Sequence, residues 1–84
     1  MEQKMINAII DQINQIDPKF KKLITFNQKQ TADAIGVSSS TLEDWRRKSI
    51  GPNYIKVEAG KRGRVLYPKT AIAEWLLSHS IKTA

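Results

Sequence analysis

Residues 27–47 read NQKQTADAIGVSSSTLEDWRR, a stretch that predicts two short helices joined by a tight turn. Asn27 is a favourable N-cap, and Gln30, three residues later, can return a hydrogen bond that completes a capping box. Gly36 easily adopts the left-handed conformation in which many helices end. Ser38 then offers a second N-cap for the helix that follows. The stretch is therefore typical of a helix-turn-helix.

The spacing of small and apolar residues supports the same interpretation. A helix-turn-helix needs a small residue at its fifth position, where the helices cross, a turn at its ninth, and apolar residues at its fifteenth and eighteenth. Counted from Gln28, these positions hold Ala32, Gly36, Leu42 and Trp45. The alternative is an ordinary pair of packed helices without affinity for DNA.

The N-terminal residues form a second helical pattern, over about residues 3–16. Apolar side chains recur every three or four positions, at Met5, Ile6, Ile9, Ile10, Ile13 and Ile16. Asp17 and Pro18 end the pattern, because the residue before a proline avoids the helical region. The stripe either docks on the rest of the domain or forms a dimer seam with a second copy through Ile6, Ile9, Ile13 and Ile16. Docking is favoured, because two heptads are short for an independent coiled coil.

The C-terminal half predicts two strands and a last helix. Residues 54–57 and 64–67 are rich in β-branched and aromatic side chains, and residues 58–63 between them contain two glycines, which suit a hairpin tip. Pro68 ends the second strand and suits the first turn of a helix over about residues 69–79. We expect that helix to bury one face, formed by Ile72, Trp75 and Leu76.

These elements predict a mainly α fold with a small β-hairpin, arranged as a winged helix-turn-helix with an extra N-terminal amphipathic helix. Residues 1–25 would form the N-terminal helix and its connector, and residues 26–80 the winged helix-turn-helix domain, in one compact unit. Phe26 stands just before the N-cap, where a hydrophobic staple would place it.

The composition of the 84 residues favours an intracellular domain without a catalytic centre. Cysteine is absent and His79 is the only histidine, so no zinc-type cluster is available. No apolar run approaches the roughly 20 residues of a membrane span, and the N-terminus, MEQKMINAIIDQ, lacks the pattern of a secretory signal. We therefore expect a cytoplasmic, nucleoid-associated protein that is not an enzyme and binds no metal or cofactor.

The net charge of +6 is concentrated in one segment. Between Arg46 and Lys69 lie eight basic residues and one acid, Glu58, whereas the other sixty residues hold six basic and seven acidic side chains. Such a block is typical of a surface that binds a polyanion. The alternative is a solvated basic face without a ligand.

A helix-turn-helix that binds DNA presents its second helix to the major groove. The residues expected on that face are Ser39, Ser40, Thr41, Glu43, Asp44 and Arg47. The two carboxylates either accept a hydrogen bond from cytosine N4 or turn away and pair with Arg46, Arg47 or Lys48; the pairing is favoured. In the hairpin tip, Lys61, Arg62 and Arg64 would contact phosphates or the minor groove, with Lys48 and Lys56 as weaker backbone contacts.

The chain resembles the small excisionase and AlpA-like proteins of the MerR-type winged-helix superfamily. The resemblance covers about residues 24–78 and rests on GVSxxTLxxW at residues 36–45 and on the aromatic-then-Ile/Leu-x-x-Trp-Leu ending at Tyr67, Ile72, Trp75 and Leu76. Gly51-Pro52 and the run 54–57 also match. The first 25 residues lie outside it.

The resemblance implies a DNA-binding protein that acts in excision of a phage or mobile element, as a recombination directionality factor, or in transcription regulation. The DNA-facing residues that it implies are Ser39, Ser40, Thr41, Asp44, Arg46 and Arg47 on the helix and Lys61, Arg62 and Arg64 in the wing. The implied partners are double-stranded DNA, a recombinase (integrase) or RNA polymerase, and further copies of the chain, as a homodimer or a cooperative oligomer on DNA. A different function stays open, that of a protein-interaction module built on the Ile-rich helix 6–16.

Overall fold

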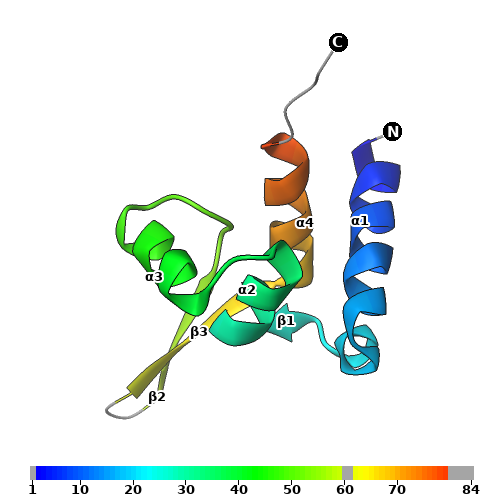
Figure 1. The fold of residues 1–84 in the computed structure, drawn as a ribbon. Helices are drawn as coiled ribbons and strands as arrows, with labels where there is room; N and C mark the ends of the chain where they lie inside the picture. Colours follow the sequence, from blue (N-terminus) through cyan, green and yellow to red (C-terminus); the bar gives the residue numbers. More distant parts are fainter. Residues whose placement is uncertain (1, 60–61, 80–84) are drawn as a thin grey trace.

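The structure, a computed structural model, describes residues 2–59 and 62–79 (Figure 1). In chain order the elements are α1 (Glu2–Ile16), a short 3-10 helix η1 (Pro18–Lys22), β1 (Thr25–Phe26), α2 (Gln28–Ile35), α3 (Ser39–Arg47), β2 (Ile55–Ala59), β3 (Arg62–Pro68) and α4 (Lys69–Ser78). The predicted mainly helical class with a β-hairpin is confirmed at this level, and the sheet has three antiparallel strands in the order β1-β3-β2.

The local signals around α2 and α3 act as the sequence predicts. The backbone N–H of Gln30 donates to Oδ1 of Asn27 over 2.8 Å, and Oε1 of Gln30 accepts from the backbone N–H of Asn27 over 3.0 Å, which completes the capping box. Gly36 ends α2 in the left-handed region, with a φ of 92°. The hydroxyl of Ser38 caps α3 by accepting from the backbone N–H of Thr41 over 3.1 Å.

The connector between α1 and α2 contains structure that the sequence did not predict. Asp17 caps η1 by accepting from the backbone N–H of Lys19 over 2.9 Å. The chain then forms β1, in which Thr25 pairs with Pro68 and Phe26 with Tyr67. A strand of two residues is too short to show an alternating pattern, so only its partner strand defines it. The predicted hairpin therefore becomes part of a three-stranded sheet.

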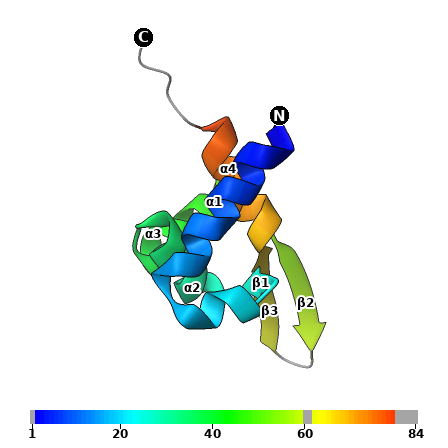
Figure 2. The same ribbon diagram turned by 90° about the vertical axis from the view of Figure 1, so that its right-hand side faces the viewer.

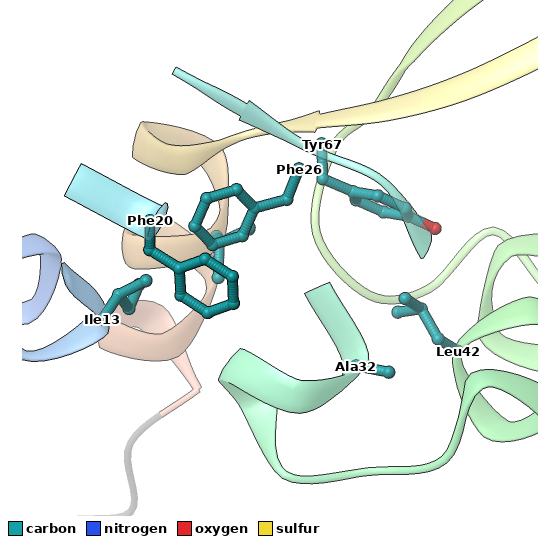
Figure 3. Close-up of a cluster of buried hydrophobic side chains, with 7 residues drawn as sticks. Ile13, Phe20, Phe26, Ala32, Leu42 and Tyr67 are labelled. Atoms are coloured by element: carbon teal, nitrogen blue, oxygen red, sulfur yellow. The ribbon is translucent and has the colours of Figure 1, made fainter. Parts of the chain in front are cut away.

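The core joins side chains from every helix and strand except β2 (Figure 3). Its buried members are Ile13, Phe20, Phe26, Ala32, Leu42, Tyr67 and Ile72. The rings of Phe20 and Phe26 lie 4.5 Å apart between their centroids. Most of these residues lie far apart in sequence, so the core closes only when α1, the sheet and α4 come together.

Helix α1 packs against η1 and α4 of its own chain (Figures 1 and 2). Of the four residues considered for a dimer seam, Ile6 and Ile13 are buried within the chain and Ile9 packs on the core. Ile16 is 52% exposed. The structure thus shows the docked arrangement of the apolar stripe, which leaves Ile16 as the seam residue most open to solvent.

Lys69, the first residue of α4, is a buried cation. Its Nζ donates to Oδ1 of Asn14 and to the backbone oxygen of Phe20, both over 2.6 Å, and lies 5.7 Å from the ring centroid of Phe26. Burial lowers the pKa of Lys69 below its ordinary value. Lys69 is one of the eight basic residues between Arg46 and Lys69. Because its side chain is buried, however, it adds no charge to a binding surface.

Candidate nucleic-acid interface

Helix α3 is held by its inner face. Leu42 is buried in the core, and the ring of Trp45 lies 5.3 Å from that of Trp75 on α4. These contacts fix how the helix is turned about its axis, because residues three apart lie on one side of a helix. The opposite side of α3 therefore faces solvent.

The exposed side of α3 carries only part of the predicted set. Ser40, Glu43 and Arg47 are exposed. Ser39 is half-buried and its backbone oxygen accepts from Nε2 of Gln28 over 3.3 Å. Thr41 is half-buried, and its hydroxyl accepts from that of Ser38 over 2.9 Å within the cap of the helix. Ser40, Glu43 and Arg47 thus form the most accessible part of the helix surface.

The two carboxylates of α3 differ in their surroundings. Oδ2 of Asp44 lies 2.9 Å from Nζ of Lys48, one helical turn away, so the predicted pairing of a carboxylate with Lys48 is confirmed for Asp44. Both side chains are largely solvated, so this ion pair adds only about 0.3–0.5 kcal/mol to stability. Glu43 has no ion-pair partner among residues 2–59 and 62–79. Its carboxylate is therefore available to a ligand.

Arg46 is turned toward the protein and not toward solvent. Its Nη1 donates to Oε1 of Gln28 over 2.8 Å and to the hydroxyl of Tyr67 over 3.2 Å. The guanidinium carbon also lies 6.0 Å from the ring centroid of Tyr54. Arg46 thereby ties α3 to α2 and to β3, a position that differs from the DNA-facing one expected for it. No local sequence signal separates it from Arg47, because its partners lie 18 and 21 residues away.

We predict that Arg46 and Arg47 contribute differently to stability. Arg46→Ala should lower the free energy of unfolding by about 1–2 kcal/mol, because it removes a charged donor from half-buried Gln28 and from buried Tyr67. Arg47→Ala should change it by less than about 0.5 kcal/mol, since Arg47 is exposed. Urea denaturation of the three proteins measures both values. Equal stability of the two variants would contradict the structural role of Arg46.

The hairpin places its basic residues on opposite faces. Lys56 pairs with Val65 and Val57 pairs with Arg64, and opposed residues lie on the same face of a sheet. Val65 packs on the core, so Lys56 is on the core-facing side of the hairpin and Arg64 on the outer side; both are exposed. Lys61 and the side chain of Arg62 lie outside the described part of the chain. The hairpin thus offers cations to ligands on either face.

An open cleft of about 820 Å³ lies where α1 and α4 meet the turn before β2. Glu2, Glu74, Trp75 and His79 contribute to its lining. Nδ1 of His79 lies 2.9 Å from the backbone oxygen of Trp75, and the two rings stack with centroids 4.7 Å apart. The histidine at the end of α4 is thus in contact with its own helix.

Two general properties complete the description of the site. Among the residues that the structure describes, no three or more histidine, cysteine or acidic side chains gather as metal ligands would. No helix within the described ranges has the length and apolar character needed to cross a bilayer.

Comparison of the chain with protein-family models, with curated proteins and with solved structures finds no match.

Proposed function

We propose that this chain is a non-enzymatic protein that binds double-stranded DNA in the manner of a winged helix-turn-helix. The observation that carries the proposal is the docking of α3. Leu42 and Trp45 hold the helix from behind, and Ser40, Glu43 and Arg47 are left open along its front. Helix α2, the Gly36 turn and the hairpin flank it, in the order that such a domain requires (Figure 1).

The distribution of charge supports the same proposal. Arg47 and Lys48 at the end of α3, and Lys56 and Arg64 in the hairpin, are all exposed cations. They remain exposed after Arg46 and Lys69 are assigned to internal contacts, and Lys48 is in addition paired with Asp44 at the surface. Because DNA phosphates attract such a cluster without regard to sequence, these four side chains would supply affinity.

In the proposed complex, the N-terminal part of α3 enters the major groove and the hairpin lies along the backbone or the minor groove. Serine and threonine hydroxyls discriminate poorly between bases, so the specificity contributed by Ser39, Ser40 and Thr41 would be modest. The resemblance to excisionase and AlpA-like proteins extends the proposal to two biological roles, excision of a mobile element and regulation of a promoter. In either role the protein would act by positioning and bending DNA for a recombinase or polymerase.

The alternative function, a protein-interaction module built on the Ile-rich face of α1, is disfavoured by the packing. Ile6 and Ile13, the centre of that face, are buried against the rest of the chain. A partner would have to displace α1 from α4 before it could reach them.

The salt dependence of duplex binding tests the DNA proposal. The logarithm of the association constant should fall steeply and linearly with the logarithm of the salt concentration. Arg47→Ala and Arg64→Ala should each make this slope shallower by about one unit, if each side chain neutralises one phosphate. Fluorescence anisotropy with a labelled duplex measures the slope.

Lys4→Ala is the matched control, because Lys4 is an exposed lysine on α1, on the other side of the fold from the hairpin (Figure 1). It removes the same charge and should leave the slope almost unchanged. Weak binding with a flat response to salt would refute the DNA proposal. An equal reduction of the slope by all three variants would show that binding depends on net charge alone and not on a defined surface of α3 and the hairpin.

A further inference from the structure

Strand β2 forms an open edge of the sheet. Among the residues that the structure describes, the order β1-β3-β2 leaves it with a single neighbouring strand, and Figure 2 shows no described helix or strand beyond it. Side chains on both of its faces are solvent-accessible: Ile55 is 49% and Val57 40% exposed, and Lys56 and Glu58 are exposed as well. An edge with branched apolar residues and free backbone groups is a template for pairing with another strand.

The charges on this edge are complementary to themselves. Lys56 and Glu58 stand one residue to either side of Val57 and point to the same face of the strand. Among the described residues neither has an ion-pair partner. If two copies of the strand run antiparallel with Val57 opposite Val57, each Lys56 stands directly across from Glu58 of the second copy. A single-residue shift of the register in either direction would break this match.

We propose that the edge of β2 binds the β2 edge of a second copy of this chain, in an antiparallel pair centred on Val57. Two cross-strand ion pairs, one apolar contact and a row of backbone hydrogen bonds hold the pair together. The edge of β2 is a different surface from the Ile6–Ile16 stripe, which is largely buried within the chain. The proposal does not depend on DNA binding, because every group in it belongs to the protein.

The symmetry of this pair has a consequence for the rest of the molecule. A two-fold axis through the Val57 pair runs perpendicular to the sheet, so each face of the sheet is on the same side in both copies. Arg46 of α3 donates to the hydroxyl of Tyr67, which lies with Val65 on the core-facing side of the sheet. Helix α3 is therefore near that core-facing side. The pair would therefore carry its two α3 helices on one common side, as binding to two half-sites requires.

A five-residue strand buries less than the roughly 1,200 Å² of a stable interface, so association should be weak, with a dissociation constant of about 0.1–1 mM. Sedimentation equilibrium of the full chain from about 0.01 to about 1 mM, at low salt, measures it. Lys56→Glu and Glu58→Lys should each weaken association by about tenfold, because each converts two attractive pairs into repulsive ones. The double exchange, Lys56→Glu with Glu58→Lys, should restore it.

Lys29→Glu makes the same change in net charge on the exposed side of α2 and is the control. It should leave the dissociation constant within a factor of about two, and circular dichroism checks that every variant is folded. The proposal is overturned if the wild-type chain stays monomeric at every concentration, if Lys29→Glu weakens association as much as Lys56→Glu, or if the double exchange fails to restore it. Each measurement is made without DNA, so failure here leaves the DNA proposal to its own test.

Discussion

Replacement of Phe26 by alanine is expected to lower the free energy of unfolding by about 3–5 kcal/mol. Phe26 has no exposed surface, its ring contacts that of Phe20, and its backbone pairs with Tyr67 in the sheet. The cavity left by the ring would lie between α1, the sheet and α4. Because domains of this size have a total stability of only about 5–10 kcal/mol, the variant should be close to unfolding at 37 °C. Thermal and urea denaturation followed by circular dichroism measure the loss.

Two controls separate the cavity from other effects of substitution. Phe26→Leu keeps most of the buried apolar volume and should cost less than about 2 kcal/mol. Ile24→Ala removes an apolar side chain two residues away that is 82% exposed, so it should change stability by less than about 0.5 kcal/mol. A cost below about 1 kcal/mol for Phe26→Ala would show that the core closes without this ring.

The helices were predictable because their signals are local. The capping box of Asn27 and Gln30, the left-handed Gly36 and the cap at Ser38 all form hydrogen bonds between residues no more than four positions apart. Strand β1 has no such signal. Its two residues form a strand only because Tyr67, 41 residues after Phe26, is brought alongside by the rest of the fold.

The candidate site was less predictable than the fold, because whether a polar side chain faces solvent or the protein depends on residues that are distant in sequence. Arg46 and Arg47 are adjacent in sequence and about 100° apart around the helix. One donates to Tyr67 and Gln28, and the other faces solvent. A count of charges along the chain treats them alike. The pairing of Asp44 with Lys48, by contrast, follows from helical spacing alone and was predicted.

Lys69 is expected to matter to stability as much as an apolar core residue. Lys69→Ala should lower the free energy of unfolding by about 2–4 kcal/mol, because it removes a buried stem and a donor that serves two acceptors. Those acceptors, Oδ1 of Asn14 and the backbone oxygen of Phe20, connect α4 to α1 and η1. Lys69→Met keeps the stem and should cost less than Lys69→Ala. An equal cost for both variants, measured by urea denaturation, would assign the whole effect to the amine.

The pH dependence of stability then distinguishes the charge of Lys69 from its packing. Burial lowers the pKa of this amine in the folded chain below 10.5, the value of an unburied lysine. Between these two pKa values the unfolded chain binds more protons than the folded chain, so stability rises with pH in that window. A neutral amine still has two N–H groups for its two acceptors, so the contacts persist after the proton is lost. Lys69→Met lacks this titration, and the stability of the wild-type chain relative to it should grow as the pH rises toward 10.5. A difference that stays constant with pH would show that the ammonium is as stable in the folded chain as in water.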